Sequence, residues 1–214
     1  IGLTDVETNS VVDVPHATEP EIDFLLSTIN TALETPLTRA EVRGTFAGLR
    51  PLVDHGETDS ADVSRRHLVT TDASGMVTVT GGKLTTYRAM AEEAVDAAMI
   101  AGRFLSRPCR TATLGLVGSG SSRAAWVPSW IRAAHGSEAE DVVAQAGANP
   151  QLLERIGPGL DLSAAQFLFG LRHEGAMSID DLVDRRTRLG MCADDRETAV
   201  DVAEWALATV HGEA

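Results

Sequence analysis

The sequence is poor in aromatic residues and in basic residues. Aromatic side chains make up only 4% of the 214 residues, whereas apolar residues reach 43% and alanine is abundant. This composition suits packed helices better than a β-sandwich. The 18 Lys and Arg are outnumbered by 31 Asp and Glu, so the net charge is -13. A broad nucleic-acid surface needs clustered cations and is therefore not expected, although a small basic pocket for one anion is compatible with this charge.

Cysteines, metal-ligand spacings and long apolar runs are also scarce. Cys109 and Cys192 form no CxxC pair, and two reduced thiols are the simpler interpretation. The six histidines have no metal-ligand spacing, so we predict no metal site. No apolar run approaches the roughly 20 residues that span a bilayer, and no signal peptide is apparent. The chain begins at Ile1 with a sequence typical of the middle of a strand, and we expect it to be a piece of a longer protein.

Helix and strand patterns alternate in the first half of the chain. A capping box at Thr18 and apolar residues at helical spacing predict a helix over residues 19–34. Residues 42–51 are predicted to form a strand that stops at Pro51. A hairpin and a long helix should follow, with strands at 65–72 and 76–80, a turn at 73–75, a break at Gly81-Gly82 and a helix from Tyr87 to Gly102.

The second half reads almost entirely as helix. Residues 103–122 are rich in glycine and serine towards their end, and we interpret them as a linker that includes the Gly118–Arg123 loop. Six short helices are predicted, near residues 123–134, 137–147, 149–157, 163–174, 179–186 and 195–211. Arg185, Arg186 and Arg188 look basic enough for an anion site, but the neighbouring aspartates at helical spacing favour internal ion pairs.

The segment VTVTGGKLTTYR, residues 77–88, carries the strongest chemical signal. Glycines let the backbone approach a ligand closely, and the free N–H groups at a helix start favour electron-rich oxygens. An ordinary tight turn followed by a well-capped helix has the same pattern. On the physics alone, the ordinary turn is the favoured interpretation.

Residues 81–92, GGKLTTYRAMAE, closely resemble the signature near the end of the flavin domain in FAD-dependent glycerol-3-phosphate dehydrogenases. The resemblance implies that Gly81, Gly82, Lys83, Leu84 and Thr85 lie against FAD. It also makes Lys83 the catalytic candidate, because a cation near the reduced flavin stabilises its negative charge.

Further segments match the family in the same order along the chain, so the resemblance covers nearly all of it. These segments are residues 1–5, 46–51, 64–65, 171–174 and 179–189. The resemblance implies an α+β fold. Residues 1–107 would form the C-terminal part of the FAD-binding and substrate domain, with antiparallel strands and long helices. Residues 108–214 would form an all-α helical C-terminal domain.

Arg50 and Arg65 are the candidate substrate ligands. A phosphate monoester calls for planar bidentate donors, which arginine supplies. Without the resemblance, surface ion pairs in an acidic protein would be the favoured interpretation of both. The family places substrate-binding arginines at these two positions, and the resemblance therefore favours phosphate binding. Arg66 is an ambiguous neighbour, since a one-residue slip of register would exchange the two side chains.

The resemblance implies that the parent enzyme oxidises glycerol 3-phosphate to dihydroxyacetone phosphate with FAD. Electrons would pass to quinone or another acceptor. The resemblance further implies a cytoplasmic homo-oligomer that associates peripherally with the inner face of the cell membrane. The Gly-x-Gly-x-x-Gly flavin fingerprint and the catalytic base are not in this sequence, so we expect the chain alone to bind FAD weakly or not at all and to be inactive.

Two alternatives stay open at this point. One is a different flavin oxidoreductase of the same superfamily that acts on an amine or an amino acid, which would need a carboxylate-binding arginine in place of a phosphate clamp. The other is a non-catalytic helical interaction module.

Overall fold

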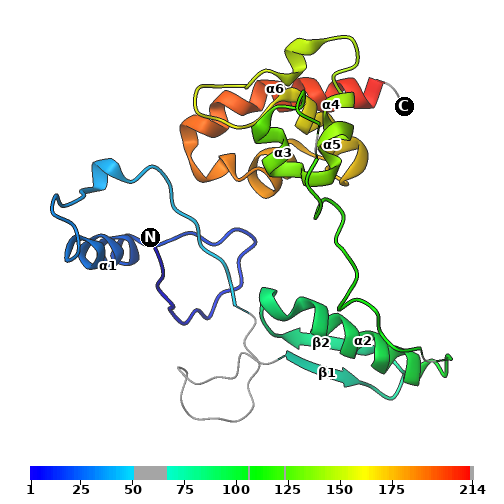
Figure 1. The fold of residues 1–214 in the computed structure, drawn as a ribbon. Coiled ribbons are helices and arrows are strands. Elements are labelled where there is room, and N and C mark those ends of the chain that lie inside the picture. The colour runs from blue at the N-terminus through cyan, green and yellow to red at the C-terminus, as the bar shows by residue number, and fades with distance from the viewer. Residues whose placement is uncertain (51–66, 106, 123, 213–214) are drawn as a thin grey trace. The chain divides into compact units, whose positions relative to one another are not determined.

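The computed structural model describes residues 1–50, 67–105, 107–122 and 124–212 (Figure 1). By backbone contacts they form two compact units. One unit comprises residues 1–47 together with 116–214, and the other comprises residues 48–115. Helices dominate, and the sheet in the described part of the chain has two antiparallel strands. The α+β class predicted from the sequence is therefore correct at this level.

The smaller unit contains a β-hairpin. Strand β1, His67–Thr71, pairs with strand β2, Val77–Gly81, in the register His67↔Gly81 to Thr71↔Val77. The carboxylate of Asp72 holds the connecting turn, because Oδ1 accepts hydrogen bonds from the backbone N–H groups of Ser74 at 2.7 Å and Met76 at 3.1 Å. This is the Asx-type bonding that favours aspartate in turns. The predicted hairpin is confirmed.

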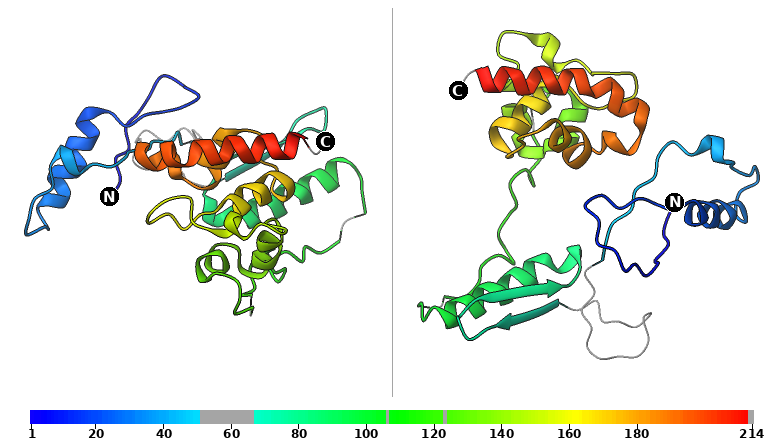
Figure 2. Two further views of the ribbon diagram at one scale, coloured as in Figure 1. Left: turned by 90° about the horizontal axis from the view of Figure 1, so that it is seen from above. Right: turned by 180° about the vertical axis from the view of Figure 1, so that it is seen from behind.

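Helix α2, Tyr87–Ala101, packs on this hairpin and follows a single 3-10 turn, η2, at Leu84–Thr86 (Figure 2). Gly102 caps its C-terminal end, and the next residue, Arg103, adopts the left-handed conformation with φ 53°. The Phe104 N–H then donates to the Met99 carbonyl at 2.9 Å, which closes a Schellman-type turn. The predicted helix from Tyr87 to Gly102 is confirmed.

The N-terminal segment carries helix α1, Glu19–Asn30, and a 3-10 turn η1, Arg39–Glu41. The capping glutamate is present as predicted, since the Thr18 N–H donates to Glu21 Oε2 at 3.0 Å. The helix ends four residues before the predicted residue 34. Asn30 explains the early end, because its side-chain amide exchanges two hydrogen bonds of 2.8 Å with the backbone of Leu37 and turns the chain back.

The strand predicted over residues 42–51 is wrong in its described part. Residues 42–50 have no regular secondary structure, and Pro51 lies outside the described residues. A strand needs a neighbour for its N–H and C=O groups, and the hairpin of the described chain pairs only β1 with β2. The apolar side chains of this segment also gain little burial, since Phe46 is 76% exposed.

The helical part of the larger unit has eight helical elements in its described residues. They are α3 Ser129–His135, η3 Gly136–Glu138, α4 Ala139–Ala144, η4 Pro150–Leu153, α5 Ala164–His173, η5 Asp181–Arg186, η6 Leu189–Met191 and α6 Ala193–Gly212. The first begins later than the predicted residue 123. Pro128 occupies its N-cap, and the residue before a proline is disfavoured in the helical conformation.

Helix α5 is the centre of the helical core. Phe167 and Leu168 pack in one cluster with Leu182 and with small residues of α6, whereas Phe169 packs in a second cluster with Ile131. The side chains of both clusters are almost completely buried. A helix that is apolar on both sides is expected at such a position. The helix predicted over residues 179–186 is present, but residues 181–186 adopt the wider π form.

Candidate functional site

The predicted flavin contacts lie together in the turn that joins β2 to α2. Gly81 and Gly82 have φ values of 71° and 87°, in the region where glycine is strongly favoured. Lys83 returns to an extended conformation, and its N–H donates to Thr86 Oγ1 at 3.4 Å. The same hydroxyl donates back to the Lys83 carbonyl at 3.0 Å. The side chain of Thr86 thus closes the first turn of the helix, as the sequence pattern suggests.

The outer face of this turn is open. Leu84 is 87% exposed and Tyr87 is 52% exposed, and Lys83 and Thr85 are exposed as well. The first N–H groups of a helix have no acceptor inside it and carry its positive dipole end. Cationic, N–H and apolar groups of this turn are therefore all accessible, and such a combination suits a planar ring system with polar edges. The residues present fit a flavin at this face.

The inner face of the turn is closed. A Cβ atom on Gly82 would lie 2.5 Å from Met90 Sδ and 3.1 Å from the Cβ of His67. Gly82 is therefore favoured by its positive φ, and a larger residue would have to displace Met90 and crowd His67. The backbone of the turn rests directly on side chains of β1 and α2, which fixes the distance between the turn and the helix.

His67 of β1 is largely buried beside the turn. Its side chain is only 17% exposed, and its Nε2 lies 2.7 Å from Glu93 Oε2 on α2. A carboxylate can only accept, so Nε2 carries the hydrogen. Sequence reasoning missed this pair because the partners are 26 residues apart and no local pattern links a strand residue to a helix residue.

Of the two candidate phosphate ligands, only Arg50 lies among the described residues. Arg50 is an exposed residue of the irregular segment, in the same unit as Lys83, and it does not lie on a strand as predicted. Arg65 and its neighbour Arg66 lie outside the described residues. The structure thus brings the five predicted cofactor contacts into one turn, while the arrangement of the arginine pair stays a prediction.

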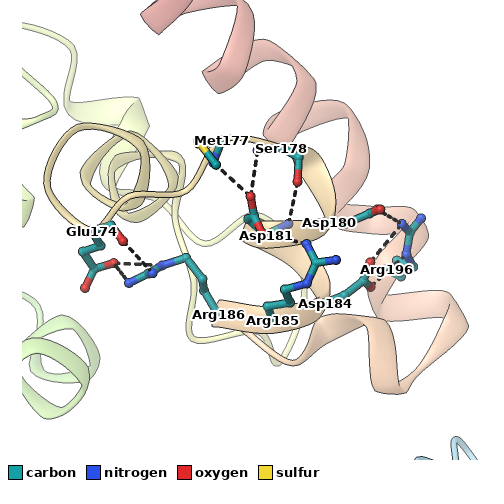
Figure 3. A network of polar contacts seen from close by, with 9 residues as sticks. All are labelled: Glu174, Met177, Ser178, Asp180, Asp181, Asp184, Arg185, Arg186 and Arg196. Carbon is teal, nitrogen blue, oxygen red and sulfur yellow. Dashed lines mark hydrogen bonds and ion pairs between the residues drawn. The ribbon is translucent and has the colours of Figure 1, made fainter. Parts of the chain in front are cut away.

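Arg185, Arg186 and Arg196 of the helical domain are engaged in ion pairs (Figure 3). Arg185 pairs with Asp181 at 2.6 Å, and Arg186 pairs with Glu174 at 2.5 Å. Hydrogen bonds from the Met177 N–H, from Arg185 and from Ser178 lower the pKa of Asp181 to about 2. The predicted structural role of Arg185 and Arg186 is confirmed.

A cavity of about 310 Å³ lies in the helical unit, and none of the predicted site residues lines it. Gln145 and His173 border it, and their side chains already interact, with 3.3 Å between Nε2 atoms, while Arg172 donates to Gln145 Oε1 at 2.9 Å. No trio of His, Cys, Asp or Glu suited to a metal ion occurs within the described ranges. No helix in the described part of the chain is long and apolar enough to cross a bilayer.

Comparison with known proteins gives a consistent result. Residues 109–212 match the C-terminal domain of alpha-glycerophosphate oxidase. The chain is 40% identical over 215 aligned residues to glycerol-3-phosphate dehydrogenase 1 of Mycobacterium tuberculosis, covering 95% of this chain and 42% of that protein. It is 35% identical to glycerol-3-phosphate dehydrogenase 2 of the same organism, covering 89% and 35%, and 33% identical to a mitochondrial glycerol-3-phosphate dehydrogenase of Arabidopsis thaliana, covering 91% and 35%.

The resemblance inferred from the sequence is therefore confirmed, and neither alternative function is favoured. The chain spans 42% or less of the length of these relatives.

Proposed function

Because this chain belongs with the C-terminal portion of the glycerol-3-phosphate dehydrogenase family, we propose that it supplies one wall of the active site of such an enzyme. The enzyme oxidises sn-glycerol 3-phosphate to dihydroxyacetone phosphate with FAD. The observation that carries this proposal is the open outer face of the Gly81–Thr85 turn at the start of α2. Within five residues it presents an exposed cation, helix N–H groups and an exposed apolar side chain.

Each residue of the turn has a distinct task in this proposal. FAD would supply the hydride acceptor for oxidation of the substrate at C2. Gly81 and Gly82 bring the backbone close to the cofactor, and Leu84 and Thr85 contact it. Lys83 supplies the positive charge that favours the reduced, anionic form of the cofactor, because a fixed cation needs no reorganisation when charge develops.

The phosphate of the substrate is held by Arg50 together with Arg65. Guanidinium groups present two parallel N–H donors to a phosphate, which gives direction as well as charge. In a protein with a net charge of -13, two local cations are needed to offset repulsion of a dianionic substrate. The acceptor of the electrons is quinone or a similar molecule, and we extend the proposal to a cytoplasmic homo-oligomer that associates peripherally with the membrane.

The test measures the complete enzyme, loaded with FAD, under anaerobic conditions. Glycerol 3-phosphate should bleach the flavin absorbance, and glycerol at the same concentration should not. Arg50→Ala should raise KM for glycerol 3-phosphate about tenfold or more while leaving the flavin content unchanged, since a charge-assisted hydrogen bond contributes roughly 1.5–3 kcal/mol.

Arg43→Ala is the matched control, because Arg43 is an exposed arginine of the same irregular segment and its Nη2 lies 3.8 Å from Asp194. Its KM should equal that of the unmodified enzyme. Unchanged kinetics for Arg50→Ala would count against the phosphate clamp. If the 214-residue chain alone retained stoichiometric flavin and reduced it with glycerol 3-phosphate, the view that it provides only one wall would be wrong.

A further inference from the structure

Two side chains lie beneath Gly82 on the inner side of the turn, His67 of β1 and Met90 of α2. Glu93 of α2 is hydrogen-bonded to His67. Met90 fills the space directly beneath Gly82, where even one added carbon atom would lie 2.5 Å from its sulfur. His67 lies opposite Gly81 in the strand register, so it stands next to the point where the chain leaves the sheet. The inner side of the turn is therefore packed against side chains of both β1 and α2.

The His67–Glu93 hydrogen bond connects β1, the partner of the strand that enters the turn, to α2, the helix that follows the turn. His67 belongs to β1, which is held to β2 by the strand ladder, and Glu93 lies in the second turn of α2. The bond is short, at 2.7 Å, and the histidine side chain is only 17% exposed. Rotation of α2 away from the hairpin would lengthen this hydrogen bond. Together with the packing of Met90, the pair links the hairpin to α2 beside the turn, with the Glu93 side chain 60% exposed.

We propose that His67 is a positioning residue, which, through its hydrogen bond to Glu93, holds the Gly81–Thr85 turn and Lys83 in the orientation required against the flavin. This inference rests on the proposed function for its ligand, but the positioning itself is a property of the chain alone. His67 does not touch the reacting atoms, because it lies on the inner face of the turn while the ligand face is the outer one.

The adjacent Arg88–Glu92 ion pair of α2 provides a control for the His67–Glu93 pair. Arg88 Nη1 lies 2.5 Å from Glu92 Oε2, and Arg88 also donates to Thr111 Oγ1 at 3.1 Å. This pair tethers α2 to the segment that follows the helix, and in the described part of the chain its hydrogen bonds do not reach the hairpin. Glu92 and Glu93 are consecutive glutamates with the same charge, so replacing each by alanine changes helix propensity and net charge equally. Only the Glu93 change removes the link to β1.

The first experiment uses the chain itself without flavin. Lys83 is the only lysine in the sequence, so labelling with ¹⁵N-lysine gives one backbone amide signal, and that signal reports on the turn. His67→Ala and Glu93→Ala should both shift it, and the double variant should shift it no further than either single change. Glu92→Ala should leave it in place. His67→Gln, which keeps an N–H donor, should restore most of the original position.

The stability of each variant is measured by hydrogen exchange, so that loss of the Lys83 signal through unfolding is recognised. If His67→Ala unfolds, His67→Gln is compared with the unmodified chain instead. An unmoved Lys83 signal in both His67→Ala and Glu93→Ala would overturn the positioning role, whatever the flavin does.

The second experiment uses the complete enzyme and measures the FAD dissociation constant and the flavin midpoint potential. His67→Ala should weaken FAD binding by about threefold to tenfold, in the range of coupling measured between contacting residues. It should also make the potential more negative, because a displaced Lys83 stabilises the reduced form less. If the amide signal moved but neither flavin property changed in His67→Ala, the positioning of the flavin face would be refuted. If Lys83→Ala also left both unchanged, the proposed flavin contact itself would fail.

Discussion

Two glycines of the hairpin unit have nearly the same backbone conformation in different surroundings. Gly75 in the hairpin turn has φ 89° and Gly82 has φ 87°. A Cβ on Gly75 would meet no atom within 4 Å, whereas a Cβ on Gly82 would meet Met90 Sδ at 2.5 Å and the His67 Cβ at 3.1 Å. Alanine at each position therefore separates the cost of the backbone conformation from the cost of crowding.

The expected magnitudes follow from this difference. Alanine with a positive φ costs roughly 1–2 kcal/mol, and this applies to both glycines. Crowding adds about 1–3 kcal/mol in a packed site. The sulfur of Met90 is near the end of a flexible side chain and can move, but the Cβ of His67 is attached to the β1 backbone and cannot move alone. We expect Gly75→Ala to cost about 1–2 kcal/mol and Gly82→Ala about 2–4 kcal/mol.

The assay is hydrogen exchange of the 214-residue chain followed by mass spectrometry. Peptides that span β2 and the first turns of α2 should show faster exchange in Gly82→Ala than in Gly75→Ala, while peptides from α5 stay unchanged in both. Equal destabilisation by the two substitutions would refute the claim that the turn rests on Met90 and His67.

The helical domain yields two further predictions, which can be followed by tryptophan fluorescence because all three tryptophans lie in residues 126–205. Phe167→Ala, at a side chain that is 1% exposed, should cost about 3–5 kcal/mol in a urea titration; Phe46→Ala, at a side chain that is 76% exposed, should change stability by less than about 0.5 kcal/mol. Burial lowers the pKa of His135 despite the opposing influence of nearby carboxylates. The folded state thus binds fewer protons than the unfolded state, so stability should be full above pH ~6.5 and fall as the solution becomes more acidic. His135→Asn should flatten that decline, and an unchanged pH profile would contradict the assignment.

Local signals in the sequence predicted most of the smaller unit correctly. The hairpin has alternating residues around an Asp-Ala-Ser-Gly turn, and its strands pair as expected because Asp72 bonds the turn backbone. Helix α2 ends at Gly102, where the glycine signal placed it. Both features depend on interactions between residues a few positions apart, which a sequence pattern records directly.

The errors arise where distant residues decide the outcome. Residues 42–50 have strand-like composition, but a strand forms only beside another strand, and composition does not say whether one is present. Helix α1 stops at Asn30 because of a bond to Leu37 across a loop. The His67–Glu93 pair was missed for the same reason, since it joins a strand to a helix through side chains.

The Gly81-Gly82 turn shows why a glycine motif is weak evidence for a ligand on its own. Packing against Met90 and the positive φ values already account for Gly82 without any cofactor. The same packing has a second effect, because it forces the following residues outward and leaves Lys83 and Leu84 on the accessible side. Leu84, next to the only lysine of the sequence, is 87% exposed. Its apolar side chain therefore gains almost no burial when this chain folds. That exposed surface, more than the glycines, is what a bound flavin would explain.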